Sequence, residues 1–125
     1  MGSITLHKIE KIYGHGAKGN KVIHAVDAQI ADGEFIVIVC PSGCGKTTIL
    51  RTISGFQDPT QGVIRIHGQD MSGIGPNQRP TPLIFQNLAL FPLMTVADNI
   101  GYGLRVRGVA KAERDRKVDE LLNLI

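Results

Sequence analysis

The sequence lacks any long apolar stretch. No hydrophobic run approaches the roughly 18 residues that a membrane-spanning helix needs, although hydrophobic residues make up 42% of the 125 residues. The N-terminus, Met-Gly-Ser-Ile-Thr-Leu-His, has neither the apolar core of a signal peptide nor the pattern for myristoylation. From these absences we expect a cytoplasmic protein.

The sequence also lacks a large net charge and a cluster of metal-binding residues. The 14 Lys and Arg residues against 11 Asp and Glu give a net charge of only +3, and the basic residues form no stripe, so we expect no nucleic-acid partner. The two cysteines, Cys40 and Cys44, have no third or fourth ligand nearby, which is not zinc spacing. A redox switch or a metal pair is one interpretation of them. The pattern favours a simpler one, two small side chains at a strand end and in a loop.

The most informative segment is 40–48, Cys-Pro-Ser-Gly-Cys-Gly-Lys-Thr-Thr, directly after an apolar run at 35–39. It matches the phosphate-loop pattern G-x-x-x-x-G-K-[ST], in which backbone N–H groups and a helix N-terminus bind phosphate. Lys46 can then reach the β- and γ-phosphates, and the Thr47 hydroxyl can bind Mg²⁺. The sequence therefore predicts a nucleoside triphosphate as the ligand.

One position departs from that pattern, because Cys40 stands where the first glycine is expected. If the position needs a conformation that only glycine adopts easily, the side chain costs about 1–3 kcal/mol. If it is simply the extended end of a strand, cysteine is tolerated. Both interpretations stay open at this point.

The hydrophobic pattern along the chain predicts an α/β protein. We expect strands at 4–12, 22–30, 35–39, 63–68 and 83–85, and helices after the phosphate loop, at 96–107 and at 110–125. The run 35–39 is apolar throughout, as in a strand buried on both faces. Alternate residues of the strand at 22–30 share one face, namely Val22, His24, Val26, Ala28 and Ile30. The last helix carries an apolar stripe made of Val118, Leu121, Leu122 and Ile125. This helix has no C-terminal cap, so we expect the chain to stop within an element.

A second motif occupies 83–96, Leu-Ile-Phe-Gln-Asn-Leu-Ala-Leu-Phe-Pro-Leu-Met-Thr-Val. A glutamine at the end of a strand beside the phosphate-loop strand can face Mg²⁺ or an attacking water. Together with 42–48 and with Ala-Asp-Gly-Glu-Phe at 31–35, this motif resembles the ATP-binding subunits of ABC importers, above all those for polyamines, ferric iron, sugars or glycerol phosphate. The resemblance covers essentially the whole chain. It departs at Cys40, Leu88 and Leu93, which weakens the importer subtype more than the family.

The resemblance implies an α/β P-loop NTPase core, here incomplete, with an antiparallel β subdomain and the start of a helical subdomain. Residues 1–85 then form the nucleotide-binding core, and residues 86–125 form the Q-loop and the beginning of the helical subdomain. The cofactors implied are ATP and Mg²⁺.

The resemblance also assigns roles to residues. Tyr13 stacks on adenine, although without the family it reads as a core aromatic at a strand end. Lys46 and Gln86 serve catalysis, and Thr47 and Gln86 bind Mg²⁺. The phosphate cradle consists of Ser42, Gly43, Cys44, Gly45, Lys46, Thr47 and Thr48.

The partners implied are membrane-spanning permease subunits and a second ATPase subunit. The permease contacts the segment from Asn87 to Met94, which would place the protein on the inner face of the cell membrane. Core packing explains Phe91, Leu93 and Met94 in that segment equally well. The paired ATPase is a second copy or a related subunit in the full-length protein.

Several motifs of the family do not occur in these 125 residues. They are the LSGGQ signature, the Walker B aspartate with its adjacent glutamate, the D-loop and the switch histidine. We therefore expect ATP binding as the N-terminal half of an importer ATPase, and no hydrolysis by the chain alone. The alternative is a truncated nucleotide-binding fragment without catalytic activity. A small P-loop kinase is disfavoured, since no Arg-rich lid follows the loop. An unpaired phosphate-loop strand also predicts marginal stability and self-association.

Overall fold

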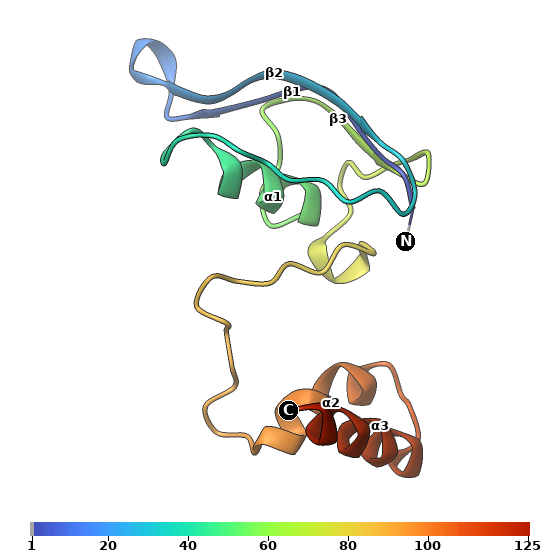
Figure 1. The fold of residues 1–125 in the computed structure, drawn as a ribbon. Coiled ribbons are helices and arrows are strands. Elements are labelled where there is room, and N and C mark those ends of the chain that lie inside the picture. The colour runs from blue at the N-terminus through green and yellow to red at the C-terminus, as the bar shows by residue number, and fades with distance from the viewer. Residues whose placement is uncertain (1) are drawn as a thin grey trace. The chain divides into compact units, whose positions relative to one another are not determined.

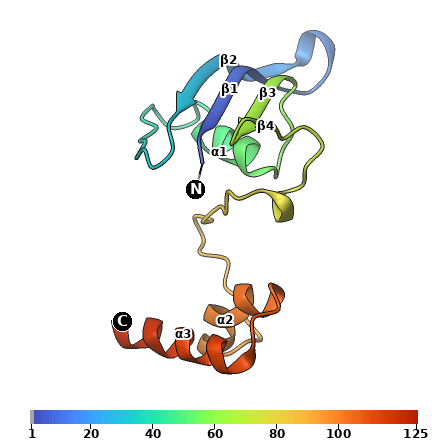
Figure 2. The same ribbon diagram turned by 90° about the vertical axis from the view of Figure 1, so that its right-hand side faces the viewer.

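The computed structural model describes residues 2–125, which divide into two compact units, Met1–Leu83 and Ile84–Ile125. The first unit contains a four-stranded sheet and one α-helix, and the second contains two α-helices (Figures 1 and 2). In chain order the elements are β1 (Ile4–Tyr13), η1 (Gly16–Lys18), β2 (Asn20–Ile30), α1 (Lys46–Ser54), β3 (Gln61–Ile66), β4 (Gln69–Asp70), η2 (Pro76–Gln78), α2 (Val96–Val106) and α3 (Lys111–Leu124).

The sheet of the first unit is antiparallel throughout, with the strand order β2-β1-β3-β4. This confirms the strands predicted at 4–12, 22–30 and 63–68. Apolar side chains from β1, β2 and β3 form a core with Ile53 of α1, which lies against one face of the sheet (Figure 1). The buried members of that core are Leu6, Ile9, Ile23, Ile53, Ile64, Ile66 and Met71.

The predicted alternation along β2 is wrong in its middle. Ala25 has φ of 43°, and the pairing register with β1 shifts between Val26 and Ile23. A bulge of this kind adds a residue and exchanges the faces of the strand on either side of it. As a result Ile23 is buried with 2% exposure, whereas His24 is exposed instead of sharing the core face.

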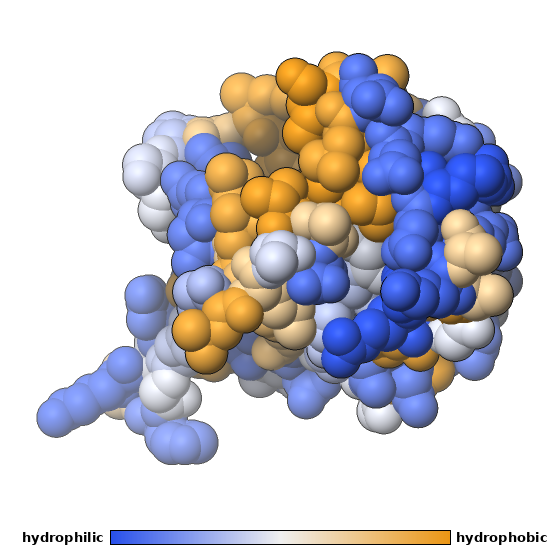
Figure 3. Space-filling model, turned by 90° about the horizontal axis from the view of Figure 1, so that it is seen from below, coloured by the Kyte–Doolittle hydropathy of each residue, from blue (hydrophilic) through white to orange (hydrophobic). Residues whose placement is uncertain are grey.

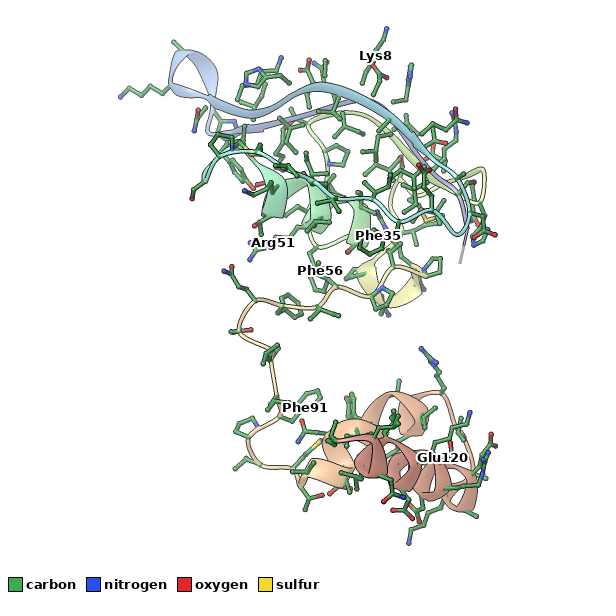
Figure 4. The ribbon with its side chains drawn as sticks, in the orientation of Figure 1. Lys8, Phe35, Arg51, Phe56, Phe91 and Glu120 are labelled. Carbon is green, nitrogen blue, oxygen red and sulfur yellow. A yellow bond between two sulfur atoms is a disulfide. The ribbon has the colours of Figure 1, made fainter. Side chains whose placement is uncertain are left out.

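The predictions of a strand buried on both faces at 35–39 and of a short strand at 83–85 are also wrong. Neither segment is assigned to a strand, and the exposed fractions of Phe35, Val37 and Val39 are 90%, 67% and 85% (Figure 4 labels Phe35). A strand that is apolar on both faces needs neighbouring strands and covering helices. Among residues 2–125 no such neighbour pairs with the 35–39 segment. Figure 3 shows broad hydrophobic areas on the face of the molecule that it draws.

The second unit matches the predicted helices closely. Thr95 is the N-cap of α2, because its side chain accepts a hydrogen bond from the Asp98 N–H at 3.1 Å. Gly101 lets α3 approach α2, since a Cβ atom there would lie 3.2 Å from a Val118 methyl group. The predicted stripe on α3 is only partly covered: Val118 is 5% exposed, but Leu121 is 50% exposed.

No helix among the described residues is long and apolar enough to cross a membrane.

Candidate functional site

The phosphate loop leads directly into α1, whose first residue is Lys46. Gly43 and Gly45 both have left-handed backbone conformations, with φ of 83° and 100°. A Cβ atom at Gly45 would lie 3.0 Å from the Val22 carbonyl oxygen and 3.2 Å from a Val22 methyl group. Glycine at position 45 therefore permits the left-handed turn of the loop and its close contact with Val22 of β2.

The ammonium group of Lys46 lies across the loop and donates a hydrogen bond to the Cys40 carbonyl oxygen at 2.5 Å. The next side chain, Thr47, is exposed, and its hydroxyl makes no hydrogen bond within the part of the chain that the structure describes. An anion at the N-terminus of α1 would thus find a cation and a hydroxyl beside it. These are groups of the kind that bind phosphate at a helix N-terminus.

Cys40 and Cys44 are joined by a disulfide, with their Cα atoms 6.3 Å apart. The interpretation of these residues as two separate small side chains is therefore wrong in this structure. The bond closes a short ring across the phosphate loop. Within this ring the backbone turns back on itself, and the Cys44 N–H donates a hydrogen bond to the Pro41 carbonyl oxygen at 3.3 Å.

A hollow of about 400 Å³ adjoins the start of α1. Apolar side chains of the unpaired segment form one wall, and the first turns of α1 form the other. Its lining consists of Ile36, Val37, Ile38, Lys46, Thr47 and Leu50. The predicted Mg²⁺ ligand Thr47 thus faces the same hollow as Lys46.

Tyr13 ends β1 and is 41% exposed. Its hydroxyl donates to Gln57 Oε1 at 2.6 Å, and the ammonium of Lys11 lies 5.4 Å from the ring centroid. Tyr13 pairs with Asn20, which is two residues along β2 from the contact of Val22 with Gly45. Because a strand rises about 3.3 Å per residue, Tyr13 lies at the end of the sheet that contacts the phosphate loop. Its role in stacking on adenine stays a prediction.

Gln86 belongs to the second unit, where it lies in an exposed turn instead of at a strand end. Leu88 and Ala89, just after this turn, have φ of 63° and 42°. Residues other than glycine rarely adopt such values. The role of Gln86 in binding Mg²⁺ or orienting water stays a prediction.

The predicted permease contact, Asn87 to Met94, is held by a residue that the sequence did not reveal. Asn99 of α2 accepts from the Phe91 N–H at 2.8 Å and donates to the carbonyl oxygens of Phe91, Met94 and Thr95 at 3.2, 3.3 and 3.0 Å. The Phe91 ring packs on Tyr102 with centroids 4.5 Å apart (Figure 4 labels Phe91). Beside this segment lies an apolar hollow of about 400 Å³, lined by Leu90, Phe91, Pro92, Met94, Val96, Asn99, Ile100 and Ile125.

Arg79 is a second residue that the sequence did not reveal. Its side chain is buried with 9% exposure and donates to the carbonyl oxygens of Thr52, Ile53, Met71 and Ile74 at 2.8 to 3.0 Å. Burial lowers the pKa of its guanidinium group, and the charge of Asp58 opposes that shift. The first two acceptors belong to the last turn of α1, so Arg79 fixes the far end of the helix that begins at the phosphate loop.

The sheet, the loop and α1 define the class of protein: an α/β P-loop NTPase domain with an antiparallel β subdomain. The family model described as ABC transporter matches residues 23–125, and the chain belongs to that family.

Its relatives include ATP-binding proteins of importers. The chain is 44% identical over 123 residues to the spermidine/putrescine import ATP-binding protein of Thermobifida fusca, covering 98% of this chain and 32% of the relative. It is 46% identical over 125 residues to the sn-glycerol-3-phosphate import ATP-binding protein of Burkholderia mallei, covering 100% and 34%. The chain thus spans about a third of the length of the curated relatives it matches.

Solved structures give the same family. The dimeric ATP-binding cassette MJ0796 bound to ADP and phosphate has a TM-score of 0.83 and 26% identity, over 96% of this chain and 56% of that one. A bacterial Atm1-family ABC exporter with ATP bound has a TM-score of 0.66 and 29% identity, over 82% and 18%. The fold class predicted from the sequence is confirmed, although the strands predicted at 35–39 and 83–85 do not form.

Proposed function

We propose that this chain binds ATP through its phosphate loop, as the N-terminal part of an importer ATPase. The observation that carries the proposal is the loop itself, in which Gly43 and Gly45 turn the backbone at the N-terminus of α1 and Lys46 lies beside them. Residues 42–48 would cradle the phosphates. The ring of Tyr13, at the nearby end of the sheet, would stack on adenine.

The donor set suits Mg²⁺ held between protein and nucleotide. Within residues 2–125 no group of three His, Cys, Asp or Glu side chains gathers as a metal cluster. Mg²⁺ is commonly bound by one or two protein oxygens together with phosphate oxygens and water. The Thr47 hydroxyl is exposed beside Lys46 and can supply one oxygen, and Gln86 would supply another. When bound, the metal would neutralise phosphate charge.

In a complete protein this site would couple ATP hydrolysis to solute uptake through permease subunits on the cytoplasmic face of the membrane. The apolar hollow beside Phe91 and Met94 supports the segment from Asn87 to Met94 as the permease contact. The solved MJ0796 cassette is dimeric by its title, which supports pairing with a second ATPase subunit. We divide the chain accordingly into a core, 1–85, and the start of the helical subdomain, 86–125.

For the chain alone we propose nucleotide binding without turnover, because the residues that hold the attacking water and the opposing charge are not among its 125. ATP turnover above background that Lys46→Ala abolishes would contradict this part of the proposal.

Titration calorimetry of the reduced protein with Mg-ATP tests the proposal. The wild type is expected to bind, and Lys46→Ala to bind at least about 10-fold more weakly, since charge-assisted hydrogen bonds contribute about 1.5–3 kcal/mol. Lys18→Ala, which removes an exposed lysine from η1, serves as the matched control and is expected to bind as the wild type does. Equal binding by wild type and Lys46→Ala, or no binding by the wild type, would contradict the proposal.

A further inference from the structure

The phosphate loop carries both cysteines of the sequence, and the structure bonds them to each other. Their Cα separation of 6.3 Å lies within the range of about 4.4–6.8 Å that disulfides usually span. Cys44 is exposed and Cys40 is half-buried, so small thiol reagents can reach the pair from solvent. The backbone of the loop therefore holds the two cysteines within the distance that a disulfide spans, and the pair is accessible from solvent.

In the bridged state the loop satisfies its own polar groups. The Cys44 N–H points to the Pro41 carbonyl oxygen at 3.3 Å, and the Lys46 ammonium is held by the Cys40 carbonyl oxygen at 2.5 Å. Both are groups that a bound phosphate would need as donors. The disulfide fixes Cys40 relative to Cys44, and with it the carbonyl that retains Lys46. To bind phosphate, the bridged loop must give up these contacts without changing the separation of its two ends.

We propose that Cys40 and Cys44 form a reversible thiol–disulfide switch that regulates nucleotide binding at the phosphate loop. The bridged loop binds ATP weakly, and the reduced loop can rearrange around the phosphates and binds ATP well. This inference rests on the proposed function, because it names a regulation of the same site. Disulfides in a reducing cytosol are usually transient and redox-sensing, which suits a bridge that is exposed and lies within a ligand-binding loop.

The oxidant is a low-molecular-weight disulfide such as oxidised glutathione. One cysteine thiolate attacks a sulfur of that disulfide, which forms a mixed disulfide and releases one small thiolate. The second cysteine thiolate then attacks the protein sulfur of the mixed disulfide, forms the Cys40–Cys44 bond and releases the second small thiolate. Two protein thiols lose two electrons, the reagent gains them, and both protons end on the two small thiols. Excess small thiol reverses both steps.

The test compares Mg-ATP affinity of the same protein after reduction with dithiothreitol and after oxidation with glutathione disulfide, each followed by removal of the reagent. Peptide mapping by mass spectrometry establishes whether Cys40 and Cys44 are bonded in each sample. We expect the oxidised protein to bind ATP at least about 10-fold more weakly, which corresponds to the loss of about one charge-assisted hydrogen bond. Renewed reduction is expected to restore the affinity.

Cys40→Ser and Cys40→Gly serve as matched variants, because neither can form the bridge. Their readout is the ratio of the affinities under the two treatments, which is expected to fall to one in both, and thermal unfolding establishes that each is folded. Glycine is the residue that the motif has at this position, so it covers the case in which serine does not fold.

Three results would overturn the switch. They are equal affinities of the reduced and the verifiably bridged wild type, a glutathione effect that persists in both Cys40 variants, and failure of oxidised protein to show the bridge. If the reduced wild type binds no ATP, the proposed function fails and the switch fails with it. If reduced and bridged protein bind equally, only the switch fails.

Discussion

Arg79 is expected to be the most sensitive side chain of the first unit. Its guanidinium donates to four backbone carbonyls, and three of these belong to Thr52, Ile53 and Met71, which are 1%, 9% and 4% exposed. In Arg79→Met the alkyl volume is kept, but those carbonyls lose their partner in surroundings that water hardly reaches. At about 1 to 1.5 kcal/mol for each carbonyl, the free energy of unfolding falls by about 3 to 4.5 kcal/mol.

Urea unfolding followed by circular dichroism measures this loss. With a slope of about 1.5 kcal/mol per molar, the midpoint is expected to fall by about 2 to 3 M, or the transition to vanish. Arg79→Lys keeps the charge but has fewer donors, so it should fall between wild type and Arg79→Met.

The matched control is Arg51→Met in α1, the helix whose last turn Arg79 contacts. Arg51 is exposed, and its side chain makes no hydrogen bond to the residues that the structure describes (Figure 4). This substitution is expected to change stability by less than about 0.5 kcal/mol. If Arg79→Met and Arg51→Met have the same midpoint, the carbonyl contacts of Arg79 do not stabilise α1 and the reasoning is refuted.

Three further substitutions test other parts of the structure. Gly45→Ala should lower stability more than Gly43→Ala. Both positions have left-handed φ, but only a Cβ atom at position 45 would meet the Val22 carbonyl oxygen, at 3.0 Å. Equal melting temperatures of the two variants would argue against this close contact of the loop with β2. Asn99→Ala removes four hydrogen bonds to the segment before α2, so hydrogen exchange of the Phe91 amide should become at least about 10-fold faster. The control Asn123→Ala, at an exposed position, should leave this exchange rate unchanged. If Asn99→Ala also leaves it unchanged, Asn99 does not hold the segment in place. Val37→Lys should reduce self-association seen by light scattering, because it charges an unpaired apolar segment; a monomeric wild type would contradict this.

Local signals explain what the sequence predicted correctly. The helices predicted after the phosphate loop and at 96–107 are bounded by local caps, Gly55 with φ of 86° and Thr95, and these caps, like the glycines of the phosphate loop, depend on a few adjacent residues. The antiparallel strands follow from alternation between turns. These features need no knowledge of distant contacts, and the family resemblance rests on the same short motifs.

Features that depend on distant partners escaped prediction. The run 35–39 has the composition of a buried strand, but burial requires neighbours that residues 2–125 do not provide. The bulge at Ala25 moved His24 to the surface, and no residue type announces it. Arg79 and Asn99 act on backbone carbonyls, which every sequence contains, so their pattern carries no signal. The Cys40–Cys44 bridge needed the fold of the loop to become visible.

Hydrogen–deuterium exchange with and without Mg-ATP shows whether the phosphate loop binds ATP. Saturating Mg-ATP in reduced protein is expected to slow exchange most in the peptide covering residues 42–48, and Lys46→Ala is expected to lose this effect. Slowing in that peptide no greater than in the peptide covering α3, or slowing that survives Lys46→Ala unchanged, would contradict it.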